Sequence, residues 1–500
     1  MNVVAELNKD ASQAVEHFDV LIVGAGISGI DAAYHLQQNC PEKSFVLLEN
    51  QESFGGTWLT HKYPGIRSDS DLFTFGYKWK PWTGVPIATA DEILKYLDEV
   101  LDEQDIRKHI RYQHQVESAD WSSEDKCWTV TVTLKDSGET VRLTGNFLWM
   151  CQGYYNHTKG YTPDWPGMER FQGEIVHPQI WPESLNYKDK RVVVIGSGAT
   201  AATLIPAMAD DCANITMLQR SPTYFAPKPN RNELAELLRE LDVPDEWTHE
   251  IVRRNILREQ KEITRRSFEE PDSLREELIG AARLFLGDDY DIDTHFTPSY
   301  RPWRQRLALI PDGDLFQGIR AGKASVVTDQ IESFTENGIQ LKSGKELEAD
   351  IIITATGFDL SILGDVAFVV DGEPLNFADC FTHRGIMYSG VPNMAWVFGY
   401  FRASWTLRSD LIAEFVCRLL SHMKAKGVSM ATPELRPEEH NMPARPFVDP
   451  ENFDPGYLMR SMHLMPKQGD RDPWLHKQDY YTEKDEIPAA DLDDGTLVYK

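Results

Sequence analysis

Apolar and polar residues follow the same order twice along the chain. An apolar run at residues 19–23 leads into a glycine turn, a helical segment with an uncharged face up to residue 36, and a second apolar run that ends at Glu49. The order returns from residue 192 through a helical segment up to residue 209 to a run that ends at Arg220. Each passage predicts a strand, a turn, a helix and a strand. The repetition therefore predicts two dinucleotide-binding units.

The second part of each unit is also repeated. Residues 128–143 alternate like a hairpin and lead into the apolar run FLWMCQG, and residues 339–347 lead in the same way into IIITATG. Both runs stop at a glycine, Gly153 and Gly357, which is typical of strands that end in a turn. The predicted fold class is α/β, with two Rossmann-like dinucleotide-binding domains.

Charged helical sequence interrupts the second unit between residues 231 and 291. Leu234, Leu237, Leu238 and Leu241 mark one face at helical spacing, which predicts a helical insertion. The insertion can either pack over the second domain or form a wall of the active site, and the pattern fits both roles.

The remaining segments carry no Rossmann signal. Beyond Phe358 we expect a helix at about residues 405–426, followed by loops and by disorder in the last dozen residues. The uncharged stretch 192–209 reaches the lower length limit of a membrane span, but its glycines and internal proline favour a buried strand, turn and helix.

The glycines of GAGISG meet the requirements of a bound dinucleotide. Gly24 allows a tight turn, Gly26 lets the backbone approach a pyrophosphate, and Gly29 permits close packing of helix on strand. Glu49, at the end of the second strand, can accept both hydroxyls of an adenosine ribose. The first unit is predicted to bind FAD.

The second fingerprint is GSGATA, formed by Gly196, Ser197, Gly198, Ala199, Thr200 and Ala201. At the place of Glu49 this unit has Gln219 and Arg220. A carboxylate there would repel a 2'-phosphate, whereas a guanidinium binds it through paired hydrogen bonds, and Ser221 can add a hydroxyl. The second unit is predicted to bind NADPH; the alternative for Arg220 is an ordinary surface arginine.

These assignments divide the chain into four parts. They are the first part of the FAD-binding domain at 1–158, a linker at 159–190, the NADPH-binding domain with its helical insertion at 191–357, and a C-terminal segment at 358–500 that returns to the FAD domain.

The net charge of the chain makes some classes of binding partner unfavourable. The chain has 51 basic and 78 acidic residues and a net charge of -27, which repels nucleic acid and anionic lipid headgroups. The N-terminal residues 1–18 lack the apolar core of a signal peptide. We expect a cytoplasmic protein without a membrane span.

The six cysteines are scattered without a CxxC pair. This argues against a disulfide framework, a zinc site and a redox dithiol, and no metal is expected. It also argues against an NADPH-dependent disulfide reductase, which shares the two-nucleotide plan but needs a dithiol near the flavin.

A motif between the two units narrows the reaction class. The segment FQGEIVHPQIWP has the form FxGxxxHxxxWP, with Phe171, Gly173, His177, Trp181 and Pro182 at the defined positions. It resembles the fingerprint of type I Baeyer-Villiger monooxygenases at every defined position. Related N- and S-oxygenating flavin enzymes usually have tyrosine or phenylalanine in place of the tryptophan.

A second motif supports the same resemblance. GGTWLTHKYPGIRSD fits the family signature [AG]GxWxxxx[FY]P[GM]xxxD, which ends at Asp69. The segments KYPGIRSDSD, MLQRSPTY, RPWRQRL and PGYLMRSMHLMPKQG are similar to those of the ethionamide-activating group, so the likeness spans nearly the whole chain.

The resemblance implies the chemistry. NADPH reduces the flavin, oxygen adds to give a peroxyflavin, and this attacks a ketone to give an ester. It implies linear and aryl ketones, with sulfides and thioamides, as small-molecule substrates beside O2. The oligomeric state, monomer or homodimer, stays open.

The resemblance also implies the site. Arg306 is the fixed cation near the flavin and Asp69 its orienting partner; Arg301 and Arg304 are close enough in sequence to act instead, or the three can bind NADPH phosphate. The implied cofactor contacts of the first domain include Ser28, Gly56, Thr57, Trp58, Tyr63, Arg67, Ser68, Asp69 and Val116.

Two positions qualify the picture. Gln305 stands where many family members have a lysine that binds the 2'-phosphate, so NADPH preference is expected to depend more on Arg220. His177 lies in the linker, and we expect it to be structural or a hinge, with proton transfer as the alternative.

The rival functions are an N- or S-oxygenating monooxygenase without ketone activity and a catalytically silent nucleotide sensor.

Overall fold

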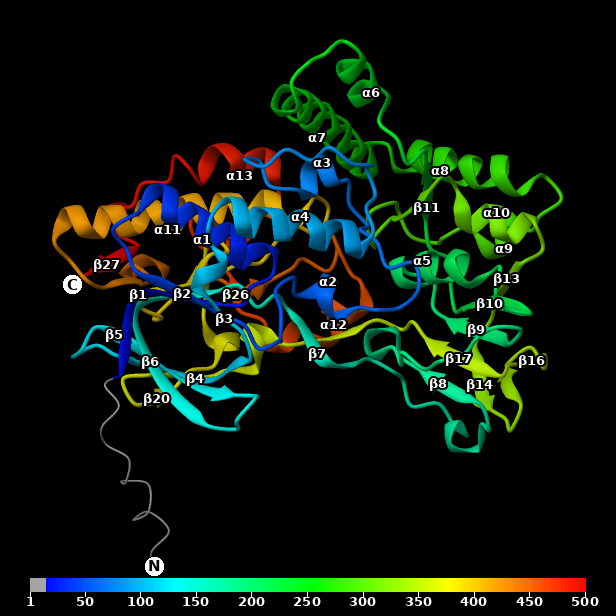
Figure 1. Ribbon diagram of the computed structural model, residues 1–500, viewed down its shortest axis with the longest axis horizontal. Helices are drawn as coiled ribbons and strands as arrows, with labels where there is room; N and C mark the ends of the chain where they lie inside the picture. Colours follow the sequence, from blue (N-terminus) through cyan, green and yellow to red (C-terminus); the bar gives the residue numbers. More distant parts are fainter. Residues whose placement is uncertain (1–14) are drawn as a thin grey trace, which may run out of the picture.

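The computed structural model describes residues 15–500, which form two Rossmann-type domains side by side (Figure 1). In the first domain, β1 (Glu16–Val23) lies parallel to β2 (Phe45–Leu48), and α1 (Ile27–Asn39) connects them. β2 is buried along its length, as expected for a parallel sheet covered on both faces. The predicted strand, turn, helix and strand are confirmed.

The hairpin of the first unit runs directly into the main sheet. β5 (Cys127–Leu134) pairs with β4 (His114–Ser122) and β6 (Thr140–Met150), and β6 continues parallel to β1. The nine-stranded sheet is completed by β3 (Ile110–Arg111), β19 (Ala367–Val370), β20 (Glu373–Pro374) and β23 (Met394–Trp396). The other helices of this domain in this part of the chain are the short α2 (Thr57–Thr60) and α3 (Leu72–Phe75) and the longer α4 (Ala90–Glu103).

The C-terminal segment returns to the first domain. β23 pairs with β6, and α11 (Trp405–Lys426), whose predicted bounds are confirmed, packs against α1. The expected disorder of the last dozen residues is wrong, because β27 (Leu497–Tyr499) pairs with β24 (Ala431–Pro433). The segment also contains α12 (Gly456–Ser461), α13 (Tyr480–Glu486) and the two-stranded pairs β21 (Thr382–His383) with β22 (Met387–Tyr388) and β25 (Arg445–Pro446) with β26 (Lys467–Gln468).

The second domain has a five-stranded parallel sheet in the order β13-β10-β9-β17-β8. Its edge strand β8 (Glu174–Val176) comes from the segment predicted as a linker. The other strands are β9 (Arg191–Ile195), β10 (Asn214–Gln219), β13 (Ala324–Thr328) and β17 (Ile351–Thr354), with α5 (Ala199–Met208) after β9 and α10 (Asp314–Arg320) before β13. Smaller sheets are formed by β14 (Ile331–Phe334), β15 (Gly338–Leu341) and β16 (Glu346–Glu348), and by β11 (Phe225–Lys228) with β12 (Ala308–Pro311).

The insertion consists of α6 (Glu233–Glu240), α7 (Asp245–Glu269), α8 (Pro271–Leu286) and α9 (Ile292–His295), with α6 and α7 rising above the rest of the fold (Figure 1). α8 packs on the second domain, but α6 and α7 pack against the core of the first. Leu234 and Leu238 take part in that packing. Leu237 and Leu241 are 50% and 65% exposed, so the leucine face is only half buried.

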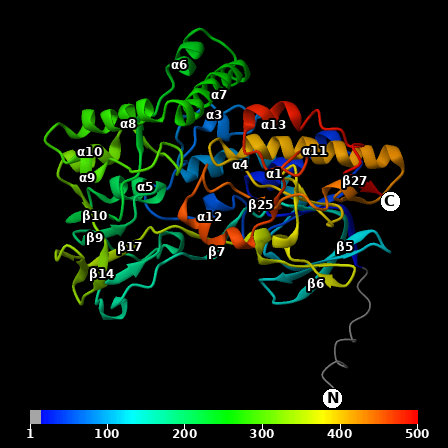
Figure 2. The ribbon, with the colours of Figure 1, turned by 180° about the vertical axis from the view of Figure 1, so that it is seen from behind.

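Two chain segments join the domains. β7 (Tyr155–Gly160) and β18 (Phe358–Leu360) pair antiparallel at the junction, with α12 beside them in the view from behind (Figure 2). The stretch 192–209 forms β9, its turn and α5. Within residues 15–500, every helix is too short or too polar to cross a membrane.

Candidate active site

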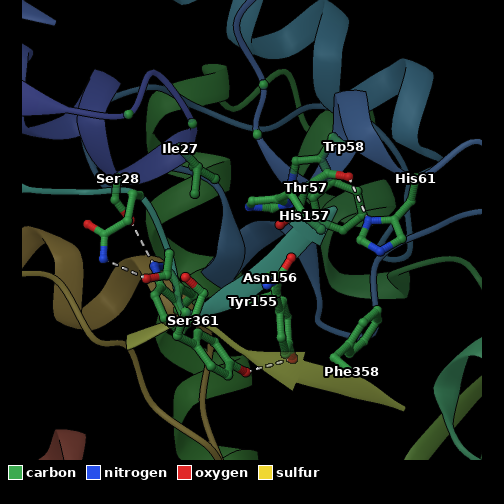
Figure 3. Close-up of a pocket in the computed structure, with 18 of the residues that line it drawn as sticks. Ile27, Ser28, Thr57, Trp58, His61, Tyr155, Asn156, His157, Phe358 and Ser361 are labelled. Atoms are coloured by element: carbon green, nitrogen blue, oxygen red, sulfur yellow. Dashed lines mark hydrogen bonds between the residues drawn. The ribbon is translucent and has the colours of Figure 1, made fainter. Parts of the chain in front are cut away.

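A cavity of about 650 Å³ lies between the two domains. Its wall brings together residues predicted separately from the two fingerprints and the family motifs, and part of it is shown in Figure 3. The predicted residues that line it are Gly24, Gly26, Ser28, Glu49, Gly56, Thr57, Trp58, Tyr63, Arg67, Ser68, Asp69, Val116, Gly198, Ala199, Thr200 and Arg306. The predicted residues outside the wall are Gly29, Gly196, Ser197, Ala201, Arg220 and Ser221. Residues 231–291, all of them described, contribute nothing to the wall.

The first fingerprint shapes one end of the cavity. Gly26 is the N-cap residue of α1 and provides no side-chain cap, so the first N–H groups of the helix remain available to a ligand. A methyl group at Gly29 would lie 1.9 Å from the carbonyl oxygen of Gly24, which explains the need for glycine there. Gly56 adopts φ of 55° and approaches Gly26 closely. The amino-terminal end of α1 therefore fits a pyrophosphate.

Glu49 lies at the same end and is 4% exposed. Its carboxylate accepts hydrogen bonds from the backbone N–H groups of Ala25 at 2.7 Å and Gln51 at 2.9 Å. Burial raises the pKa of Glu49, although these backbone hydrogen bonds act in the opposite direction. The side chain is fixed by the turn and lines the cavity, as a ribose ligand requires.

Backbone hydrogen bonds align the two fingerprints residue by residue. The Gly24 N–H donates to Leu48 O, and the Gly196 N–H donates to Leu218 O, both at 2.8 Å. Gln219 is therefore the counterpart of Glu49, and it is buried, with its amide nitrogen donating to His295 O and Thr328 Oγ1. Arg220 and Ser221 follow it and are exposed. The second domain thus has no carboxylate at this position.

The second signature contributes residues to both domains. Trp58 and Thr57 belong to α2 of the first domain. Next to this signature, Ser28 Oγ of the first fingerprint accepts a hydrogen bond from Trp405 Nε1 at 2.8 Å. Tyr63 packs into the core of the second domain, and burial raises its pKa to about 12. Arg67 Nη1 donates to Asp314 Oδ2 of the second domain at 2.6 Å. The signature therefore also ties the domains together.

Arg306 and Asp69 meet across the cavity wall. Arg306 Nη1 donates to Asp69 Oδ2 at 2.7 Å, and the two side chains are 31% and 37% exposed. Burial lowers the pKa of Arg306, but the charge of Asp69 and the hydroxyls of Tyr457, Tyr154 and Tyr155 together outweigh this, and the pKa lies well above its ordinary value. Arg306 is therefore a permanent cation facing the cavity.

The other two arginines of this loop have different partners. Arg304 Nε donates to Asp454 Oδ2 at 2.8 Å. The Arg301 guanidinium lies over the Phe268 ring, 4.2 Å from its centroid. Of the three candidates, only Arg306 lines the cavity.

Sequence reasoning missed an aromatic wall beside Arg306. Tyr154 and Tyr155, whose hydroxyls are hydrogen-bonded at 2.7 Å, line the cavity with Tyr457 and Trp405. Tyr154 stacks on Trp405 with ring centroids 5.2 Å apart. The signal for the tyrosine pair was available, because it directly follows Gly153 at the carboxyl end of a strand, where α/β folds bind ligands.

His177 lies beside the two connections between the domains. Its Nδ1 accepts from the Gln179 N–H at 3.2 Å, so Nε2 donates to Gly357 O at 3.1 Å. Burial lowers the pKa of His177 despite the bond to Gly357, which keeps the ring neutral. Both nitrogens are engaged by backbone, which supports the structural role.

The chain matches two family models and several FAD-containing monooxygenases. A family model described as flavin-binding monooxygenase-like matches residues 86–228, and one described as an NAD(P)-binding Rossmann-like domain matches residues 22–81. FAD-containing monooxygenase EthA of Mycobacterium tuberculosis (strain ATCC 25618 / H37Rv) is 48% identical over 97% of this chain and 98% of that protein. The probable FAD-binding monooxygenase AlmA of Acinetobacter baylyi is 43% identical over 97% and 96%.

Solved structures show the same architecture. A steroid monooxygenase bound to NADP aligns with a TM-score of 0.68 and 24% identity over 84% of this chain and 88% of that one. Cyclohexanone monooxygenase from Rhodococcus sp. Phi1 bound to NADP+ aligns with a TM-score of 0.69 and 21% identity over 85% and 87%. The predicted fold class, with two dinucleotide-binding domains, is confirmed.

Proposed function

The chain belongs to the FAD-containing monooxygenases that it matches over nearly its whole length, and we propose that it converts ketones to esters with NADPH and O2. The observation that carries the proposal is Arg306, a cation held by Asp69 on a cavity between two dinucleotide-binding units. The tryptophan of the FxGxxxHxxxWP motif, Trp181, favours ketone chemistry over oxidation of nitrogen or sulfur alone.

The residues of the first domain fit FAD. Glu49 would accept the ribose hydroxyls, the uncapped end of α1 would bind the pyrophosphate, and Thr57 with Trp58 would meet the flavin. When bound, FAD takes a hydride from NADPH and activates oxygen for transfer of one atom. The amino-terminal end of α5, which lines the cavity, would bind the pyrophosphate of NADPH, and Arg220, outside the wall, would bind its 2'-phosphate.

Arg306 would stabilise the negative charge that develops on oxygen during transfer. A preorganised donor of this kind contributes about 3 kcal/mol to transition-state stabilisation. Asp69 holds the guanidinium in place through Nη1 and keeps it charged, which leaves the other N–H groups of Arg306 to act on the substrate. The wall of Tyr154, Tyr155 and Tyr457 would exclude water, which protects the activated oxygen from unproductive loss as hydrogen peroxide.

The substrate class follows from this wall and from the family. Aromatic side chains favour apolar molecules, so we propose linear and aryl ketones, together with sulfides and thioamides, as the small-molecule partners. The same cation would serve transfer of oxygen to sulfur, so both activities can reside in one site.

Labelled oxygen tests the reaction. The flavin-loaded enzyme is incubated with NADPH, oxygen-18 gas and linear, cyclic and aryl ketones, and the products are analysed by mass spectrometry. We expect esters that carry one labelled oxygen atom. Labelled sulfoxides from sulfides without ester from any ketone would instead support an N- or S-oxygenating monooxygenase.

A substitution tests the residue that carries the proposal. In Arg306→Ala, we expect NADPH to reduce the flavin at the wild-type rate while ester formation falls by about 100-fold, the loss typical of one such donor. Arg258→Ala, on the exposed face of α7, removes a charge of the same sign and serves as the control. Normal ester yield in Arg306→Ala would refute the assignment.

A further inference from the structure

We propose that Asp454 is a positioning residue for oxygen transfer, because it holds the loop that carries Arg306; this inference rests on the proposed role of Arg306. The loop runs from the end of α9 at His295 to the start of β12 at Ala308 and forms neither helix nor strand. A cation stabilises developing charge efficiently only when it is fixed before the reaction. The contacts that immobilise this loop therefore affect catalysis.

Asp454 binds the two residues that directly precede Arg306. Its backbone N–H donates to Arg304 O at 3.0 Å, and its Oδ2 accepts from Arg304 Nε at 2.8 Å. Its Oδ1 accepts a longer hydrogen bond from Gln305 Nε2 at 3.5 Å. Asp454 lies outside the cavity wall, whereas Gln305 and Arg306 belong to it. Asp454 thus acts on the site through its neighbours in the loop.

The loop contains a conformation that must be held. Trp303, next to Arg304, has φ of 62°, in the left-handed region that a bulky side chain adopts only when its surroundings impose it. Arg402 Nε donates to Trp303 O at 3.3 Å, and Arg402 also donates to Asn452 O. Arg301 Nη2 donates to Asn452 O at 2.9 Å. The segment that carries Asn452 and Asp454 is therefore bonded to the loop on both sides of Trp303.

The same C-terminal segment also supplies part of the cavity wall. Tyr457 follows Asp454 by three residues, at the start of α12, and lines the cavity with Arg306. The Arg304 and Asp454 side chains are 43% and 23% exposed. An ion pair this exposed contributes little to overall stability. Because Arg304 lies two residues before Arg306, the ion pair between Arg304 and Asp454 sets where the Arg306 cation lies relative to Tyr457.

The test separates flavin reduction from oxygen transfer in the full-length, FAD-loaded enzyme. For Asp454→Ala we measure reduction by NADPH without oxygen, and product formed per NADPH oxidised with the ketone or sulfide that the wild type oxygenates fastest. We expect unchanged reduction and about a 10-fold or greater fall in product per NADPH, with hydrogen peroxide in its place. The largest expected fall in product is on the order of 100-fold, because a misplacement of a reacting group by about 1 Å has this effect on rate.

A charge reversal and a nearby control make the test specific. The double variant Arg304→Asp with Asp454→Arg restores the pairing and is expected to recover part of the yield lost in Asp454→Ala. Glu451→Gln, an exposed change in the same segment, is expected to behave as wild type. Flavin absorbance and thermal melting establish that each variant is folded; if Asp454→Ala fails to fold, Asp454→Asn replaces it, with the same fall in yield expected in smaller measure.

The outcomes also distinguish this inference from the proposed function. Wild-type product yield in a folded Asp454 variant, together with impaired Arg306→Ala, would overturn the role of Asp454 alone. Equal losses in flavin reduction and in product yield would likewise overturn it, because they indicate a general structural defect. Normal yield in Arg306→Ala would overturn both.

Discussion

Replacing Arg220 with alanine tests how the second domain distinguishes NADPH from NADH. Gln219, the counterpart of Glu49, is 2% exposed, and its amide nitrogen donates to His295 O and Thr328 Oγ1, so its side chain is held inside the domain. Arg220 is exposed directly after β10. Of these two residues, only Arg220 can reach a phosphate outside the sheet.

The expected magnitude follows from this exposure. Two charge-assisted hydrogen bonds from a guanidinium to a phosphate are each worth about 1.5–3 kcal/mol when shielded. Screening at an exposed site reduces their joint contribution to about 1.5–2 kcal/mol. This corresponds to roughly a 10- to 30-fold rise in the KM for NADPH. The KM for NADH, which has no 2'-phosphate, is expected to change by less than about twofold.

The assay is steady-state oxidation of each nucleotide, followed by the loss of its absorbance at saturating oxygen. Arg231→Ala is the matched control, because Arg231 is an exposed arginine of the same domain that pairs with Glu233 at 3.1 Å. It removes the same charge and is expected to leave both KM values unchanged. An equal rise for both nucleotides in Arg220→Ala, or no rise at all, would refute the assignment of the 2'-phosphate site.

Two further predictions concern buried carboxylates. Glu49→Gln is expected to weaken FAD binding by roughly 30- to 150-fold, because the hydrogen bonds from the two ribose hydroxyls would lose their charged acceptor. Flavin fluorescence titration measures the affinity, with Glu52→Gln as the control. Unchanged affinity in Glu49→Gln would contradict the prediction. Burial and the charge of Asp410 raise the pKa of Asp31 to about 8, so its contribution to stability is complete at low pH and is lost as the pH rises through that value. Asp31→Asn cannot titrate, so its melting temperature is expected to fall less than that of the wild type between about pH 6 and pH 9; parallel curves for the two proteins would count against this.

Residues from three distant parts of the chain form a buried cluster around Asp31. His35 Nε2 lies 3.2 Å from Asp410 Oδ1, and these two residues are 375 positions apart in the chain. Arg253 Nη2, from the helical insertion, lies 3.9 Å from Asp410 Oδ2. The fingerprint helix, the C-terminal helix and the insertion thus meet in one network of charges. Their sequences contain the residues, but no local pattern indicates that these residues meet.

The sequence by itself determined the two nucleotide units and the order of their elements. Glycine turns, short apolar runs and a residue such as Glu49 act within a few tens of residues, so local pattern is sufficient to identify them. The change from Glu49 to Gln219 and Arg220 was visible for the same reason. The family resemblance also named Asp69 and Arg306 as partners, and in the structure Arg306 Nη1 donates to Asp69 Oδ2 at 2.7 Å.

Only the tertiary structure decided which side chains face the cavity. Arg301, Arg304 and Arg306 are equivalent as letters, but their loop turns so that one meets Asp69, one meets Asp454 and one covers Phe268. The insertion was predicted either to pack over the second domain or to form a wall of the active site, yet α6 and α7 pack on the first domain. These outcomes depend on contacts between segments hundreds of residues apart, which no period of two or 3.6 residues encodes.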